Sequence, residues 1–311
     1  MKTIYRKWNC YNIAANKQYI AAFGEGVTVL KRDTLELVHH FTGMRSIHGG
    51  LFVGDDVIFV HTGEQKFYFL SVKDKSVIWN PKRPTQLRNC GGIRAVSIPG
   101  TTQVACIGRG KSEDMREHYL VILDVDSHSV ALRPIPDCYR VVGQLICSEN
   151  GVLSFITSMG RNGLMTYRVI SMDLAGNVIA CVDWSSREIV DYYCGTCLFA
   201  GNTRDVAPYL RYYARKESGY DFAHGTDLPV PVFRFQDGPV GSAYDYVPHV
   251  NAMDDSGTMV VACASDWIGV IALESGKLLL EESVPYIYCG KIIDNRLLIG
   301  CAKGLHVVSM D

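Results

Sequence analysis

Short apolar runs separated by polar turns recur along the whole chain and indicate β-strands throughout. Five stretches, which begin at Tyr19, Val57, Gln103, Val152 and Met259, each contain a strand, a loop, a second strand, a tight turn and a third strand. Their tight turns read RDT, VKDK, DSHS, LAGN and ESGK, and such residues suit hairpins. A further apolar run precedes each stretch, so the pattern predicts units of four antiparallel strands. No window of about a dozen residues shows helical periodicity, which favours an all-β fold.

Seven such units can be placed along the chain, each about 40–50 residues long, which is the period of β-propeller blades. Their second strands are expected to begin near Tyr19, Val57, Gln103, Val152, Thr196, Met259 and Leu297. In the fifth unit we predict CLFAGN, YLRYYARK and VPVFRF as the second, third and fourth strands, with a long insertion around 215–229. Residues 1–311 are therefore predicted to form a single all-β domain, a seven-bladed β-propeller with four antiparallel strands per blade.

The two ends of the chain are expected to meet in the last blade. The seventh unit has three strands and no fourth, whereas an unassigned strand, KTIYRKW at 2–8, precedes the first unit. Trp8 would end this strand as Trp79 and Trp184 end the fourth strands of two other units. We therefore predict that the N-terminal strand closes the last blade, which removes the exposed edges that an open sheet would leave.

The last two units carry a recognisable repeat pattern. VVACASDWIGVIALESGKLLLE and NRLLIGCAKGLHVVSMD resemble the strand, Gly-bearing turn and GLxxLDxxTGKxxW pattern of the β-propeller superfamily, of the WD40-like and quinoprotein-like (PQQ-repeat) kind. The resemblance covers the whole chain at the level of blades. The chain lacks the Gly-His and Trp-Asp dipeptides of true WD40 repeats and has only the reversed pairs Asp183-Trp184 and Asp266-Trp267. The resemblance therefore implies a fold, and it implies no particular function, because propellers host binding platforms and enzymes alike.

Composition and charge narrow the classes of partner. The net charge is −1 and charged residues make up 20% of the chain, so no global field draws it to nucleic acid or to an anionic membrane. No apolar run approaches the length of a membrane span. The N-terminus has no signal-peptide pattern, and the eleven cysteines are scattered through apolar runs. We expect a cytoplasmic monomer with reduced thiols that binds neither nucleic acid nor membranes.

The predicted loops differ between the two faces of the propeller. The longest join second to third strands or one blade to the next, and they occupy 80–92, 108–118, 157–164, 201–208 and 236–246. We call this side the long-loop face and the opposite side, whose connections are mostly short, the tight-turn face. The insertion at 214–229 is expected on the tight-turn face. Loops longer than stability requires tend to carry function, so we expect a partner on the long-loop face.

Cationic side chains supply the candidate binding residues for a partner or anion at the channel mouth. Four arginines stand near the starts of innermost strands: Arg45, Arg94, Arg140 and Arg187. Three more lie in long loops, Arg109, Arg161 and Arg204, and Trp267 is the one aromatic candidate. Arginine forks suit carboxylate and phosphate groups. The alternative is solvated loop charge, or internal pairing with acids such as Asp191, Glu188 and Asp245, and the sequence leaves these possibilities open.

Catalytic chemistry has weaker support. Cys194 and Cys197 form the one CxxC of the chain, and we expect neither a redox nor a metal role, because residues i and i+3 of an extended strand point to opposite sides. His48, Asp191 and His249 could line the channel as acid–base groups or metal ligands, or could be hydrogen-bonded structural residues. No common catalytic motif occurs, and we predict no catalytic residues, metal or cofactor. The sequence favours a non-enzymatic binding platform for a protein or peptide. The alternative is a lyase-like or hydrolase-like enzyme with its site at the channel mouth.

Overall fold

The structure is a computed structural model that describes residues 2–5, 9–63, 66–111, 117–135, 138, 140–161, 164–202, 204–205, 208–216, 219–235 and 244–310. The described side chains exclude those of residues 2–5, 89–94, 143, 161, 204–205, 219, 235 and 244. Within the described ranges every regular element is a β-strand, and no helix long and apolar enough to cross a membrane is present.

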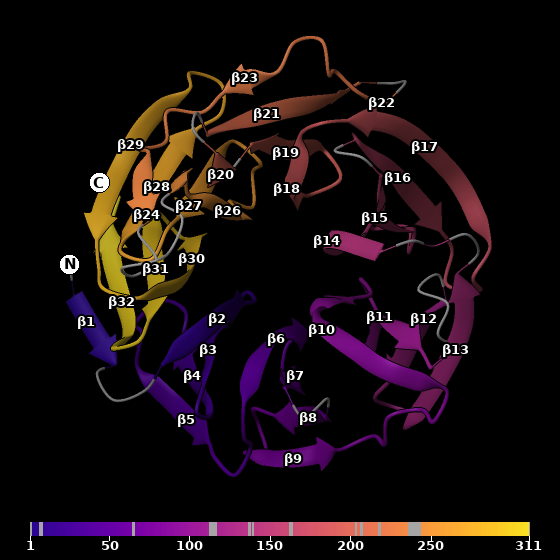
Figure 1. Cartoon of the computed structure of the whole chain (residues 1–311). Helices are drawn as coiled ribbons and strands as arrows, with labels where there is room; N and C mark the ends of the chain where they lie inside the picture. The colour runs from indigo at the N-terminus through magenta and orange to yellow at the C-terminus, as the bar shows by residue number, and fades with distance from the viewer. Residues whose placement is uncertain are drawn as a thin grey trace, which may run out of the picture.

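Seven antiparallel sheets stand side by side in a ring, which confirms the seven-bladed β-propeller (Figure 1). The innermost strands of the blades are β2 (Cys10–Ala15), β6 (Ile47–Val53), β10 (Leu87–Ser97), β14 (Arg140–Cys147), β18 (Ile189–Tyr193), β26 (His249–Met253) and β30 (Ile287–Ile293). Each of these strands contacts the innermost strand of the next blade, and β30 contacts β2, so the seven enclose a central channel. All seven begin on the long-loop face, because each follows a connection from the previous blade.

The remaining strands of each blade lie progressively further from the channel. The second strands are β3 (Tyr19–Gly24), β7 (Val57–Thr62), β11 (Gln103–Gly110), β15 (Leu153–Arg161), β19 (Cys197–Asn202), β27 (Met259–Cys263) and β31 (Arg296–Cys301). The third strands are β4 (Val27–Lys31), β8 (Phe67–Ser71), β12 (His118–Asp124), β16 (Leu164–Met172), β21 (Tyr209–Lys216), β28 (Trp267–Ala272) and β32 (Gly304–Ser309). The fourth strands are β5 (Leu37–Phe41), β9 (Ser76–Trp79), β13 (Ser129–Ile135), β17 (Val178–Ser186), β23 (Thr226–Asp227), β29 (Lys277–Ser283) and β1 (Lys2–Tyr5). Every predicted second-strand start lies within one residue of the observed start.

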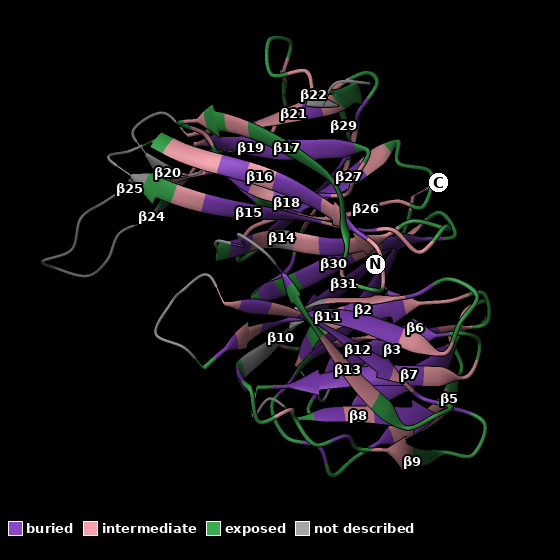
Figure 2. Cartoon of the chain, turned by 90° about the vertical axis from the view of Figure 1, so that its right-hand side faces the viewer, coloured by how far each residue is buried: buried purple, intermediate pink, exposed green. Residues whose placement is uncertain are grey.

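The hydrophobic core is divided into seven clusters, and each fills the space between two neighbouring blades. In β3, Ala21 and Phe23 pack against blade 2, whereas Ile20 and Ala22 pack against blade 7. Successive side chains of a strand point to opposite faces of its sheet, so a strand between two blades must be apolar at every position. This explains why the middle strands read as continuous apolar runs. Figure 2 shows the result, with buried inner strands and exposed turns and outer strands.

The N-terminal strand closes the ring as predicted. β1 pairs antiparallel with β32, with Lys2 opposite Val307, Thr3 opposite His306 and Tyr5 opposite Leu305. Trp8, the other part of this prediction, lies outside the described residues. Trp79 and Trp184 do lie in fourth strands, and each also meets the next blade. The Trp79 ring stacks on His128 of blade 3 at 5.3 Å between centroids.

Blade 5 differs from the prediction. Its fourth strand is the short β23 within the insertion, where Arg211 pairs with Asp227, and not VPVFRF. Pro229 and Pro231 have no backbone N–H, so that segment is a poor ladder strand. β22 (Gly219–Tyr220) pairs with the end of β21, and β24 (Phe233–Phe235) joins β20 (Arg204–Asp205) and β25 (Tyr244–Tyr246) in a separate sheet. The strands β20, β24 and β25 of this separate sheet project from one side of the ring (Figure 2).

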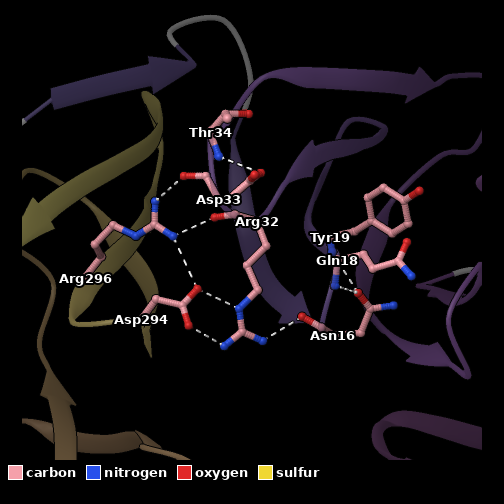
Figure 3. Close-up of polar contacts among 8 residues, drawn as sticks. All are labelled: Asn16, Gln18, Tyr19, Arg32, Asp33, Thr34, Asp294 and Arg296. Atoms are coloured by element: carbon pink, nitrogen blue, oxygen red, sulfur yellow. Dashed lines mark hydrogen bonds and ion pairs between the residues drawn. The ribbon is translucent and has the colours of Figure 1, made fainter.

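A polar clamp joins blade 7 to blade 1 on the tight-turn face (Figure 3). The Arg32 guanidinium donates to both carboxylate oxygens of Asp294, each at 2.7 Å, and to the carbonyl of Asn16 at 2.7 Å. Arg296 donates back across the same junction to the carbonyls of Arg32 and Asp33. Hydrogen bonding from Arg32 lowers the pKa of Asp294 below its ordinary value. The clamp therefore supplements the β1–β32 pairing at the point where the ring closes.

We expect Arg32→Ala to lower the free energy of unfolding by about 1 kcal/mol at pH 7, because a bidentate but partly exposed ion pair is lost. Since the folded pKa of Asp294 is depressed, this contribution is complete above about pH 4 and disappears as the pH falls through the lowered value. Urea unfolding at pH 7 and pH 3 measures both effects. Lys31→Ala is the matched control, because the Lys31–Glu36 pair is exposed and lies within one blade. Equal losses for both variants at pH 7, or a loss for Arg32→Ala that does not shrink as the pH falls, would contradict the clamp.

Candidate functional site

Three of the predicted arginines stand where innermost strands begin on the long-loop face. Arg45 lies two residues before β6, Arg140 is the first residue of β14, and Arg187 lies two residues before β18. All three are exposed. Buried neighbours hold the backbone at these points, as Met44 and Ile47 do on either side of Arg45. Because innermost strands line the channel, the three arginines are distributed around its mouth, in blades 2, 4 and 5.

None of these three arginines forms a hydrogen bond or ion pair with any described residue. The acids proposed as internal partners are engaged elsewhere. Both carboxylate oxygens of Asp191 accept hydrogen bonds, one from His249 Nδ1 at 2.5 Å and one from the Val250 N–H at 2.6 Å. Asp245 lies 3.8 Å from Arg234. Internal pairing with these acids therefore does not neutralise the arginines.

Glu188 follows Arg187 in the chain but turns into blade 5. Its carboxylate accepts hydrogen bonds from the Tyr209 hydroxyl at 2.9 Å, from the Tyr213 hydroxyl, and from Arg211 Nη1 at 3.2 Å. Burial raises the pKa of Tyr213 to about 12, and the bond to Glu188 adds to the shift. Four polar groups thus satisfy one another inside the blade, so Glu188 is a structural residue and does not pair with Arg187.

The other predicted binding residues have different settings. The side chains of Arg94, Arg161 and Arg204 lie outside the described residues, although the backbone places Arg94 well inside β10 and not at its start. Arg109 is half-buried near the end of β11. Trp267 is buried in the core between blades 5 and 6, where its Nε1 donates to Glu281 at 3.3 Å. Its ring is therefore largely used in packing.

The structure brings together two of the three predicted channel residues. The Asp191–His249 bond links the innermost strands of blades 5 and 6, and His249 is about half exposed, at 48%. His48 lies in blade 2 across the ring, packed near His61 at 6.1 Å between ring centroids. In the described part of the chain, no three His, Cys, Asp or Glu side chains gather as they would around a metal ion.

Three tyrosines at the same mouth escaped sequence analysis. Tyr11 and Tyr288 are the second residues of β2 and β30, and Tyr286 directly precedes β30. Their exposed fractions are 36%, 40% and 68%, and the rings of Tyr11 and Tyr288 lie 4.8 Å apart. A signal existed, because Tyr11 and Tyr288 are large aromatic residues at the second position of two innermost strands. Tyrosine and arginine are the residue types that most often anchor protein interfaces.

Deeper in the channel lies a cavity of about 170 Å³, lined by Lys291 together with the amides of Asn12, Gln144 and Asn251. Burial lowers the pKa of Lys291. No acid is among the described residues that line this cavity. The channel wall therefore adds a lysine below the mouth whose charged form burial disfavours, and sequence analysis also overlooked it.

The CxxC pair is arranged differently from the prediction. Cys194 and Cys197 do not occupy one extended strand, because they flank the two-residue turn between β18 and β19. The Cys194 N–H donates to the Cys197 carbonyl at 3.2 Å, and Gly195 supplies the positive φ of 85° in the turn. A reversal of the chain places both side chains on one face of the hairpin, and the two sulfurs lie 3.0 Å apart.

Comparison with known proteins identifies the fold of the chain but no family within it. No protein-family model and no curated protein matches the sequence. Among solved structures, hydrazine synthase of Kuenenia stuttgartiensis is similar, with a TM-score of 0.68 and 11% identity over 97% of this chain and 95% of that chain. The computationally designed Ika8 protein has a TM-score of 0.61 and 11% identity over 98% of this chain and 97% of its own. The chain is a β-propeller. Identities this low carry no information about what this propeller binds.

Proposed function

We propose that the protein is a binding platform that holds an acidic segment of a partner protein or peptide across the channel mouth on its long-loop face. The observation that carries the proposal is the state of Arg45, Arg140 and Arg187, which are exposed and unpaired with any described residue while nearby acids are engaged elsewhere. Like charges around one opening repel, so an external anion is the natural counter-charge.

Two further features support an acidic peptide. The exposed tyrosines Tyr11, Tyr286 and Tyr288 offer rigid aromatic area beside the charges, as interface anchors do. The cavity below the mouth is lined by Lys291 and by no described acid, so an acidic side chain would meet no like charge there. The alternative, an enzyme at the mouth, depends on the Asp191–His249 pair. Both oxygens of Asp191 already hold blades 5 and 6 together, so the pair is explained by structure alone.

Selection from a phage-displayed random peptide library tests the proposal. Peptides recovered by the protein are expected to be enriched in Asp and Glu with an aromatic residue. The triple variant Arg45→Ala, Arg140→Ala, Arg187→Ala is expected to bind them at least about tenfold more weakly, since three charge-assisted contacts are lost. Its melting temperature should be unchanged or slightly higher, because no internal partner is lost and repulsion is relieved.

Lys17→Ala, Lys73→Ala, Lys277→Ala is the matched control, since it removes the same charge from exposed positions at turns of the tight-turn face. This variant should keep the affinity of the unaltered protein. Equal weakening in both triple variants would mean that only net charge matters. Enrichment of basic or purely apolar peptides would refute the acidic partner.

A further inference from the structure

The hairpin of blade 5 that carries Cys194 and Cys197 forms a chemically asymmetric thiol pair. Cys197 is 1% exposed, and its sulfur also contacts the sulfur of Met253 at 3.3 Å. Cys194 is half-buried and lies at the turn, where its sulfur is 3.3 Å from the Thr196 hydroxyl. One thiol can therefore be reached from solvent, and the other stands behind it at 3.0 Å.

The surroundings activate the reachable thiol. Hydrogen bonding from the Cys197 thiol, assisted by the Thr196 hydroxyl and by backbone hydrogen bonds, lowers the pKa of Cys194 to about 6 despite its partial burial. The same interaction, together with burial, raises the pKa of Cys197. At neutral pH Cys194 is thus mostly thiolate, the nucleophilic form, while Cys197 keeps its proton.

We propose that Cys194 and Cys197 form a peroxide-sensitive dithiol, in which Cys194 is the attacking residue and Cys197 resolves the product into a disulfide. The Cys194 thiolate attacks the terminal oxygen of a hydroperoxide. An S–O bond forms as the O–O bond breaks, so Cys194 becomes a sulfenic acid, and the alkoxide or hydroxide takes up one proton and leaves as an alcohol or water. The Cys197 sulfur then displaces the hydroxyl group as water and forms the S–S bond. The two thiols lose two electrons in all, and a dithiol reductant returns them by exchange.

Ordinary buried cysteines provide the contrast. A free Cys in a core behaves as a small inert hydrophobe, and burial raises the pKa of the buried Cys301. Cys181 is exposed on an outer strand and carries a free thiol. If exposure alone governed oxidation, Cys181 would react first. The proposal requires instead that Cys194 react first, because its thiolate fraction is about tenfold or more higher than that of an ordinary thiol.

The test is oxidation of the fully reduced protein with equimolar hydrogen peroxide, followed by alkylation and peptide mass spectrometry. The expected product is one disulfide between Cys194 and Cys197, formed at least about tenfold faster than Cys181 is oxidised. In about 8 M urea, which unfolds the chain, this preference should disappear. Cys197→Ser should stop the reaction at a Cys194 sulfenic acid that dimedone captures, and Cys194→Ser should leave Cys197 unreacted.

Two outcomes would overturn the proposal. One is oxidation of Cys194 no faster than that of Cys181 in the folded protein. The other is a sulfenic acid at Cys194 that persists with Cys197 present, because the buried thiol would then fail to resolve it. Cys181→Ser, which removes the exposed competitor, should leave formation of the disulfide unchanged and shows that the pair acts without other thiols.

Discussion

Deletion of residues 1–9 is expected to abolish cooperative unfolding and to convert the protein into aggregates. β1 is the fourth strand of blade 7, and its loss exposes the backbone N–H and C=O groups of β32 along Gly304–Ser309. An unpaired apolar edge is a template for pairing with another chain. Leu305 and Val307 of the same strand also belong to the cluster between blades 7 and 1, so the deletion loosens the junction that closes the ring.

Size-exclusion chromatography with light scattering and a thermal scan followed by circular dichroism measure these effects. A synthetic peptide of residues 1–9, added in excess, should restore the molar mass and the melting temperature of the intact chain by occupying the vacant edge, and a scrambled peptide of the same composition should not. A truncated protein that keeps the molar mass of a single species and melts like the intact chain would show that the ring closes without β1.

Replacement of Glu188 by Ala is expected to lower the free energy of unfolding by about 2–4 kcal/mol. Its side chain is only 14% exposed and accepts from two tyrosine hydroxyls and one guanidinium. Its removal leaves the buried Tyr213 hydroxyl and the half-buried Tyr209 hydroxyl without this acceptor. Arg211 is affected less, because it keeps its bond to Asp227 at 2.6 Å.

Equilibrium urea unfolding measures the loss, and Glu188→Gln separates charge from hydrogen bonding. The amide keeps one acceptor oxygen but places an N–H₂ donor against other donors, so about half of the loss should remain. Glu274→Ala, at an exposed turn, is the control. A change in Glu188→Ala no larger than in this control would mean that the hydroxyls find other acceptors, and Glu188 would then be free to pair with Arg187.

Blade 5 shows where reading of the sequence failed. Its first three strands were predicted, since each is a local apolar run bounded by turn residues. Its fourth strand was placed at VPVFRF on apolar character alone, although the prolines at 229 and 231 argue against a ladder strand. The short strand Thr226–Asp227 is polar and carries no apolar signal. It is held by pairing with β21, and that partnership is visible only in three dimensions.

The candidate site was likewise predictable from the sequence only in part. The arginines at strand starts follow from counting strands, because topology sends every innermost strand away from the same face. That Arg45, Arg140 and Arg187 have no partner among the described residues could not be foreseen. Asp191, Glu188 and Asp245 are close to Arg187 in sequence or expected position but turn toward other groups. For Cys194 and Cys197, the periodicity of an extended strand predicted side chains on opposite sides. A two-residue turn between the cysteines reverses the chain instead and brings the two sulfurs together.

The sequence by itself determined the all-β class, the number of blades, the second-strand starts and the closure by the N-terminal strand. These properties rest on hairpins whose strands are neighbours in the chain and on a core in which each strand is buried on both faces. The tertiary structure decided which side chains meet across blades: Arg32 with Asp294, Asp191 with His249, Tyr11 with Tyr288. Such contacts join residues up to 277 positions apart, as between Tyr11 and Tyr288 (288 − 11), and no local pattern encodes the register between one blade and the next.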